Sequence, residues 1–277
     1  MARALAQAPL DADIVLVGPE DQVATIPARS RLGVGTWGDG AGGERVAGQL
    51  AGRSIERAVW LARGGEVDAV VTGPVHKAAL HGAGYRFPGV TEFLGSLAGG
   101  AEAVMMLAVP GLRVVLVTTH LALRDVPSQL TTDRIVRVGR ITLAALREWF
   151  AIPAPRLALC ALNPHAGEAG LFGDEDERLL APAARTLGAA GPLPADTVFV
   201  RALRGEFDAV LAPYHDVGMT AVKVAGFGRG VNVTLGLPFP RTSPDHGTAF
   251  DIAGKGIADP SSMRAALELA VQLAKRG

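Results

Sequence analysis

Short, almost continuously apolar runs alternate along the chain with longer stretches of helical periodicity. The apolar runs have the length of buried strands, and their lack of a polar face is typical of strands covered on both sides, as in a parallel or mixed sheet. They cover residues 13–17, 67–72, 103–108, 113–119, 156–162, 207–212 and 231–235. Strands that alternate with helices in this way predict a layered α/β fold.

Four stretches have the periodicity of amphipathic helices, and three of them carry a recognisable start signal. They cover residues 45–63, 132–150, 174–187 and about 260–275. Thr131 or Thr132 is a suitable N-cap for the second helix. The third opens with four consecutive acids, 174–177, which favour the positive end of a helix dipole. The fourth opens with Asp259-Pro260, a cap followed by proline in the first turn.

Charge and cysteine content narrow the class of protein. Lysine plus arginine equals aspartate plus glutamate, at 27 each, so the chain lacks the basic surplus of a nucleic-acid binder. Its one cysteine, Cys160, lies inside an apolar run and is predicted to be a small buried hydrophobic residue in a reducing compartment. The most apolar region, 103–117, is broken by Pro110 and Arg113 and is too short to span a bilayer. Without a signal-peptide pattern at the start, we expect a cytoplasmic protein.

Three of the six histidines follow predicted strands. His120 comes directly after the run 113–119, His165 comes shortly after 156–162, and His215 comes shortly after 207–212. The carboxyl ends of strands in an open α/β sheet are where ligands bind. Three imidazoles at that edge are able to hold one divalent ion and leave positions open for substrate oxygens. The alternative is that each histidine only satisfies its own loop.

Acidic residues close to these histidines are candidate hydrogen-bond acceptors for the imidazole N–H groups. Asp125, Glu168 and Asp216 lie within five residues of a histidine of the trio. They are equally compatible with solvated loop positions.

A glycine motif near the amino terminus, 33–38, matches the GxGxxG pattern of nucleotide-binding loops. The pattern requires a preceding strand and a following helix. Residues 28–32 make a poor strand, and more glycine follows before any helix. We therefore interpret this motif as an ordinary loop.

A second glycine-containing segment, 245–260, resembles the adenosine-binding loop of the isopropylmalate and isocitrate dehydrogenase superfamily. The resemblance implies that His246 lies against the adenine, with Gly247 beside it, and that Asp251 contacts the ribose hydroxyls. An acid there would repel a 2′-phosphate, so NAD is expected rather than NADP.

From about residue 13 to its end, the chain resembles the PdxA family, the 4-hydroxythreonine-4-phosphate dehydrogenases of pyridoxine biosynthesis. The strings that carry the resemblance are TGPVHK (72–77), TEFL (91–94), TTHL (118–121), NPHAGE (163–168), GPLPADT (191–197), YHD (214–216) and GFGRGVN (226–232). The resemblance implies a two-lobed α/β/α sandwich with a mixed, mostly parallel sheet and a cleft between the lobes. It implies one catalytic unit, 1–277, split into 1–100 with 225–277 and 101–224, and a homodimer with shared active sites.

The family's functional residues fall on positions that this chain retains. Its metal ligands fall on His120, His165 and His215, and the metal is expected to be zinc, with cobalt or magnesium as alternatives. Its substrate contacts fall on Thr91, Lys223, Asn232 and Arg241, of which the two cations suit a phosphate and a carboxylate. Lys223 and Asp216 are the candidate catalytic residues. The implied reaction oxidises a secondary alcohol with NAD, after which the β-keto acid loses carbon dioxide.

Two departures from the family pattern bear on the substrate. The family has a substrate-contacting histidine where this chain has Val90, which is unable to donate a hydrogen bond. The family also opens with a strand and a loop of the form DPxGIGPE, and this sequence has no equivalent. The alternatives are therefore a sister dehydrogenase of D-threonate or D-erythronate 4-phosphate, or of a cyclic diol, and a non-catalytic relative.

Overall fold

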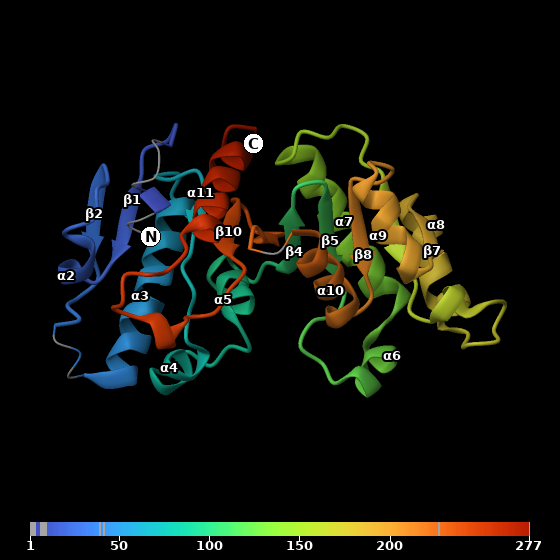
Figure 1. The fold of residues 1–277 in the computed structure, drawn as a ribbon, viewed down its shortest axis with the longest axis horizontal. Helices are drawn as coiled ribbons and strands as arrows, with labels where there is room; N and C mark the ends of the chain where they lie inside the picture. The colour runs from blue at the N-terminus through green and yellow to red at the C-terminus, as the bar shows by residue number, and fades with distance from the viewer. Residues whose placement is uncertain (1–3, 6–9, 39, 41, 227, 277) are drawn as a thin grey trace. The chain divides into compact units, whose positions relative to one another are not determined.

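The computed structural model describes residues 4, 5, 10–38, 40, 42–226 and 228–276, so Phe227 of the string 226–232 lies outside the described residues. The chain divides into two compact units. Unit 1 contains the residues up to Ala103 together with Leu237–Lys275, and unit 2 contains Val104–Gly236 with the last residues of the chain. Strands and helices alternate in both units, which confirms the α/β fold class (Figure 1).

Unit 2 contains a mixed sheet with the strand order β9-β4-β5-β8-β6-β7. Strand β4 pairs antiparallel with β5 and β9, whereas β5-β8, β8-β6 and β6-β7 are parallel pairs. Its strands are β4 (Val104–Val109), β5 (Leu112–Leu116), β6 (Leu157–Cys160), β7 (Ala190–Leu193), β8 (Ala209–Ala212) and β9 (Val231–Leu235). The parallel strands β5, β8 and β6 therefore end at one common edge.

Helices cover this sheet and bury its apolar side chains. Helix α10 (His215–Gly226) packs on β4, β5 and β8, as Figure 1 shows. It shares one hydrophobic core with α9 (Ala195–Leu203), to which Val114, Val210, Phe199 and Val222 contribute. Helix α7 (Thr132–Glu148) packs on α8 (Ala181–Leu187). Four short elements complete the unit, namely η1 (Leu123–Asp125), α6 (Val126–Gln129), η2 (Pro164–Gly167) and η3 (Asp176–Leu180).

Unit 1 contains two parallel strand pairs, β1-β2 and β3-β10. Its strands are β1 (Val15–Gly18), β2 (Ser30–Gly33), β3 (Val70–Val71) and β10 (Arg241–Pro244), and its helices are α2 (Glu20–Val23), α3 (Gly43–Arg63), α4 (Lys77–Gly82), α5 (Val90–Leu97), η4 (Phe250–Ile252) and α11 (Ser261–Ala274). Helix α3 packs on α4, α5 and β1, and α11 packs on β10. Ile55, Val59, Phe93 and Leu94 form the core between α3 and α5.

The periodicity correctly predicts α3, α7 and α11 and a strand in each apolar run, with shifted ends. The predicted helix 174–187 is a π-helical segment, η3, followed by the short α8, and α10 was not predicted. Thr131 is the N-cap of α7, and its side chain accepts a hydrogen bond from Arg134 N at 3.1 Å. At the start of α11, Asp259 accepts the backbone N–H of Ser261 at 2.9 Å. None of the described helices is both long and apolar enough to cross a membrane.

Three strands escaped the sequence analysis. The expectation that residues 28–32 form no strand is wrong, because β2 lies at Ser30–Gly33 and pairs with β1. Strand β10 has the sequence RTSP and is buried throughout. A buried polar strand has no apolar run to reveal it. Strand β7, with the sequence AGPL, is half-buried and shows no alternation.

Candidate metal and substrate site

His120 and His215 lie close together because the strands that precede them are paired. In the parallel pair β5-β8, Leu116 lies opposite Ala212. The pairing continues past the strand ends, where the fully buried Thr118 donates its hydroxyl to Pro213 O at 2.7 Å. Two residues further along each segment, the rings of His120 and His215 have centroids 5.6 Å apart.

His215 is the first residue of α10, and an adjacent carboxylate orients its ring. Its Nδ1 lies 3.2 Å from Asp216 Oδ1. A carboxylate that accepts the Nδ1–H of an imidazole leaves Nε2 available to a metal. The contact is compatible with the acceptor role for Asp216, whose carboxylate is at the same time largely exposed to solvent.

His165 follows the neighbouring strand β6 and lies in η2, where its backbone is left-handed with φ 51°. Its ring centroid is 6.2 Å from that of Phe172. Within the part of the chain that the structure describes, no three His, Cys, Asp or Glu side chains are grouped closely enough to hold a metal ion. The structure thus brings His120 and His215 together and leaves His165 outside that pair.

The His120–His215 pair has the spacing that a shared ion requires. With Zn–N bonds of about 2.1 Å at a tetrahedral angle, two coordinated imidazoles have centroids about 5 Å apart. The observed 5.6 Å is close to this separation. Imidazole nitrogen is a good ligand for zinc and cobalt and a poor one for magnesium. The donor set therefore fits a zinc-like ion and needs one further protein ligand.

Two predicted substrate residues of unit 2 lie on α10 and on β9. Lys223 follows His215 by eight residues on α10, which places both residues on one face of the helix. Asn232 lies on β9 opposite Leu107 of β4, and its buried Oδ1 has no hydrogen-bond partner among the described residues. Since buried polar atoms normally have partners, this oxygen fits a ligand group that donates.

Arg241 and Thr91, the predicted substrate residues of unit 1, lie on separate elements. Arg241 begins β10, is only 4% exposed and donates to the hydroxyl of the buried Thr72. Burial lowers the pKa of Arg241 to about 10, so the guanidinium stays charged at neutral pH. Thr91 is the second residue of α5 and is half-buried.

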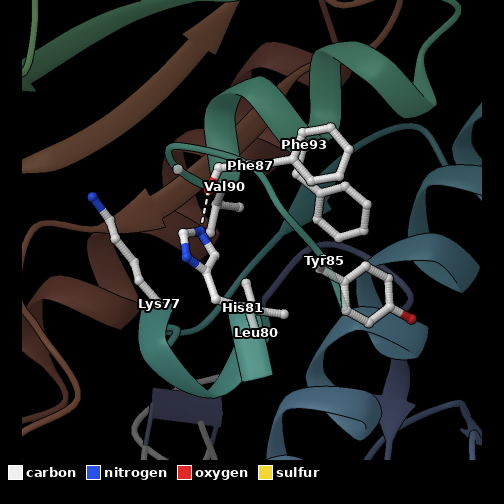
Figure 2. A pocket seen from close by; sticks show the side chains of 8 residues that line it. Lys77, Leu80, His81, Tyr85, Phe87, Val90 and Phe93 are labelled. Carbon is white, nitrogen blue, oxygen red and sulfur yellow. Dashed lines mark hydrogen bonds between the residues drawn. The ribbon is translucent and has the colours of Figure 1, made fainter. Parts of the chain in front are cut away.

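Val90 lies in a small pocket that Figure 2 shows from close by. The pocket is lined by Lys77, Leu80, His81, Tyr85, Phe87, Gly89, Val90 and Phe93. His81 Nε2 lies 2.6 Å from Phe87 O, so this imidazole closes the loop between α4 and α5. Val90 packs against the core of unit 1. At this position the chain presents a methyl surface where a histidine would present a hydrogen-bonding group.

The predicted cofactor residues lie together on the loop after β10. His246 and Asp251 are exposed, and His246 Nδ1 lies 2.9 Å from Gly247 O. Phe250, next to Asp251, meets the edge of the His76 ring at a centroid distance of 5.2 Å. This contact joins the TGPVHK segment to the loop that carries the predicted cofactor residues.

The GxGxxG-like segment is a loop, as we predicted. It follows β2, but nine residues separate Gly33 from the start of α3 at Gly43. The backbone N–H groups of Trp37 and Gly38 donate to the carboxylate of Asp21 at 2.9 and 3.1 Å. The amides that a phosphate would need are therefore occupied by a side chain of the protein.

Sequence reasoning missed three residues that support the site, Thr72, Thr118 and Asp176. The acids 174–177 were interpreted only as favourable to a helix dipole, yet Asp176 is 1% exposed and accepts backbone N–H groups of Leu162 and Asn163. A signal was present, because Asp176 precedes the buried Leu180 by four residues and so lies on the buried face of its helix. Thr72 and Thr118 carry no such signal.

Comparisons with known proteins agree with this geometry. The family model described as "Pyridoxal phosphate biosynthetic protein PdxA" matches residues 19–270. A 4-hydroxythreonine-4-phosphate dehydrogenase of Caulobacter vibrioides is 52% identical over 235 residues, which cover 81% of this chain and 71% of that protein. A D-threonate 4-phosphate dehydrogenase of Cupriavidus necator is 51% identical over 240 residues, covering 83% of this chain and 71% of that protein.

Solved structures extend the similarity to the fold. The crystal structure of a 4-hydroxythreonine-4-phosphate dehydrogenase from Klebsiella pneumoniae has a TM-score of 0.80 and 40% sequence identity, over 98% of this chain and 86% of that one. The chain therefore belongs to the PdxA family of oxidoreductases.

Proposed function

We propose that the chain is an NAD-dependent, divalent-metal-dependent dehydrogenase of 4-phosphooxy-L-threonine. The observation that carries the proposal is the His120–His215 pair, with a centroid distance of 5.6 Å, at the ends of two parallel strands of a PdxA-family sheet. The product would be 3-amino-2-oxopropyl phosphate, formed by decarboxylation after oxidation, as a step of pyridoxine biosynthesis.

The metal site in this proposal consists of His120, His165 and His215, with zinc as the expected ion and cobalt as a substitute. A divalent ion bound there polarises a substrate hydroxyl and stabilises negative charge on its oxygen. Asp216 fixes the orientation of His215 through the 3.2 Å contact to Nδ1. Replacing Asp216 would therefore disturb the ligand without removing it.

The cations of the chain suit the charges of the substrate. Arg241 and Lys223 pair with its phosphate and carboxylate, and the substrate ammonium or hydroxyl group donates to Asn232 Oδ1, which is buried without a partner. Oxidation moves a hydride from the carbinol carbon to NAD and a proton from the hydroxyl to a base. The candidates are Asp216 and Lys223, of which Lys223 acts as a base only as the neutral amine and then does not serve as a cation for the substrate. The β-keto acid then releases carbon dioxide, and a proton takes its place on carbon.

For the cofactor we propose NAD, held by His246, Gly247 and Asp251. The supporting feature is the exposed carboxylate of Asp251, which would repel the 2′-phosphate of NADP. Exchange of Asp251 for serine should weaken NAD binding and reduce the preference for NAD over NADP. Initial rates with each cofactor measure this preference, and an unchanged ratio contradicts the assignment.

We propose that His165 joins the other two ligands when two copies of the chain associate, since no set of three lies within the described part of one chain. Mixing inactive His120→Ala and His165→Ala variants tests this. Half of the sites in each mixed dimer then hold three histidines, so activity should recover to about a quarter of the wild-type value. If His165 serves its own chain, the mixture stays inactive.

The substrate is tested by following NADH formation with 4-phosphooxy-L-threonine in the presence of zinc or cobalt. Turnover that disappears with a chelator and returns with the metal supports the proposal. Absence of turnover by the metal-loaded dimer overturns the substrate assignment.

D-Threonate 4-phosphate is the second candidate substrate, and Val90 is the observation that favours it. The methyl groups of Val90 face a pocket with mostly apolar walls, which offers no partner there for an ammonium group. D-Threonate 4-phosphate has a hydroxyl where 4-phosphooxy-L-threonine has its ammonium group. It should therefore lose less binding free energy when valine stands in place of the family's histidine. The substrates to compare are 4-phosphooxy-L-threonine, D-threonate 4-phosphate, D-erythronate 4-phosphate and a cyclic diol. The ratio of their kcat/KM values shows which of them the enzyme prefers.

A further inference from the structure

His165 opens a run of six consecutive residues with a left-handed backbone, which we call the His165 turn (165–170). Four of them are not glycine, namely His165, Ala166, Glu168 and Ala169, with φ values of 51°, 55°, 42° and 54°. This conformation is unfavourable for L-residues, because it brings Cβ too close to the following carbonyl oxygen. Such strain persists only where the surrounding structure enforces it, and it is concentrated at functional sites.

Two backbone hydrogen bonds lie inside the His165 turn. Glu168 N donates to His165 O at 3.2 Å, and Gly170 N donates to Gly167 O at 2.9 Å. Most residues of the turn are exposed, so water competes for these groups. Further bonds join the turn to its flanks, because Ala166 N donates to Asn163 O while Gly167 O and Glu168 O accept from Phe172 N and Leu171 N. The segments at the two ends of the turn therefore help to hold its conformation.

A buried carboxylate holds the segment that leads into the His165 turn. Asp176, which is 1% exposed, accepts Leu162 N at 2.8 Å and Asn163 N at 2.9 Å. These amides link the end of β6 to the turn. The side chain of Asn163 also donates to Glu175 Oε2 at 2.8 Å. Charge-assisted bonds of this kind are about twice as strong as neutral ones.

The middle of the His165 turn packs against the segment that leads into Asp176. A Cβ added at Gly167 would lie 2.8 Å from Gly173 O and 3.8 Å from Asp176 Cβ. The backbone there approaches so closely that only glycine fits. Asp176 therefore fixes the entry to the turn and adjoins its middle.

We propose that Asp176 is the positioning residue for His165, and this inference rests on the proposed assignment of His165 to the metal. The carboxylate sets the direction in which the chain leaves β6 and thereby the direction of the imidazole. It touches neither metal nor substrate in this role. Its loss should appear first as weaker metal binding, beyond what a loss of stability explains.

Asp176→Asn is the variant that tests the proposal. The amide keeps one acceptor but turns an NH₂ group toward the second backbone N–H. Cobalt titration of the metal-free dimer should give a dissociation constant weakened at least about tenfold, the range for lost ligand-orienting partners. The visible absorption bands of the bound cobalt should also change, because they report ligand geometry.

Asp208→Asn is the matched control, because Asp208 holds the start of β6 as Asp176 holds the segment after its end. Asp208 is also largely buried and accepts the backbone N–H of Arg156, the residue before β6, at 2.7 Å. This variant should lower Tm but leave the cobalt dissociation constant and spectrum as in the wild type. Equal effects of the two variants on cobalt binding would overturn the proposal.

A milder pair of variants applies if Asp176→Asn fails to fold. Glu175→Ala removes the acceptor of the Asn163 side chain, and Glu177→Ala removes an exposed acid of the same run. The first should weaken cobalt binding and the second should not. Wild-type binding from both variants contradicts the proposal.

The same titration separates this inference from the metal assignment. If the wild type binds no cobalt, or if His165→Ala binds it as well as the wild type does, the metal assignment fails and the inference fails with it. If His165→Ala weakens binding and Asp176→Asn does not, only the inference is overturned.

Discussion

Some side chains that are not predicted to contact a ligand orient the charged groups of this protein through hydrogen bonds. Thr72 is one of them, because its hydroxyl accepts a hydrogen bond from the buried guanidinium of Arg241. Both residues are less than 10% exposed, at 8% and 4%. A buried cation that loses an acceptor costs about 1–3 kcal/mol and is free to turn.

Thr72→Val should therefore raise the KM for the phosphorylated substrate about tenfold, with a smaller change in kcat, because Arg241 is misdirected rather than lost. Steady-state kinetics measure the effect. Thr142→Val is the control, since Thr142 is equally buried and only bonds Val138 O within α7. If both variants change KM alike, the effect is general destabilisation.

Asp208 makes the stability of unit 2 depend on pH. Burial alone would raise the pKa of Asp208, but hydrogen bonds from the side chain and backbone of Arg156 outweigh burial and lower it. A lowered carboxylate pKa stabilises the fold at any pH above the unfolded value of about 3.9. This stabilisation is lost as the pH falls from there through the lower folded value.

The free energy of unfolding of the wild type should consequently drop more steeply between about pH 5 and pH 3 than that of Asp208→Asn. Urea titrations at each pH give the two curves. Parallel curves through this range would show that Asp208 has an ordinary pKa.

At the residue scale, the sequence predicts which residues come together at the strand ends better than it predicts the residues that support them. His120 and His215 were predicted from their strand-end addresses, because topology alone brings such ends to one edge. Thr118, Thr72 and Asp176 were not predicted, because their roles depend on which backbone group lies within 3 Å of them. Distances of that kind are fixed by packing, which a pattern of apolar positions does not specify.

Among the elements, α10 has the most direct influence on the site, since it begins at His215. Its approach to the sheet depends on Gly218. A Cβ there would lie 2.7 Å from Leu116 Cδ2 and 3.0 Å from Ala212 Cβ. The helix therefore lies on β5 and β8 at a distance that only glycine permits.

Gly218→Ala should displace α10 by a few tenths of an ångström, cost about 1–3 kcal/mol and weaken metal binding through His215. Thermal unfolding and cobalt titration measure the two effects. Gly82→Ala, at the open end of α4, is the control, because a Cβ there meets nothing within 4 Å. Metal affinity that is unaffected by Gly218→Ala would mean that α10 does not set the position of His215.

Helices and strands were predicted correctly where their buried residues are apolar and regularly spaced. They were missed where the buried residues are polar. Helix α7 was predicted with its cap because its apolar face and its Thr131 signal agree. Strand β10 was not, because RTSP is buried through hydrogen bonds such as Thr242 Oγ1 to Ala266 O. The conformation of the His165 turn was not predictable from residue propensities, since its four non-glycine residues adopt a backbone that L-residues disfavour.

For the whole molecule, the proposed metal site should couple ligand binding to stability. An ion that binds only the folded protein adds about 2.7 kcal/mol at a hundred times its dissociation constant. Zinc or cobalt should therefore raise the Tm of the wild type by several degrees and leave that of His120→Ala unchanged. Calorimetry with and without a chelator measures the shift, and an equal shift in both proteins contradicts the site.

Cys160 gives the molecule a property that is useful for studying its motion. It is the one cysteine of the chain, its side chain is buried in β6, and burial raises its pKa to about 12. Maleimides react with thiolates, so the Cys160 thiol should not be labelled at neutral pH. One cysteine introduced on the surface of each unit then gives two thiols that take a fluorophore, and energy transfer between the two labels would test whether the distance between them changes during turnover.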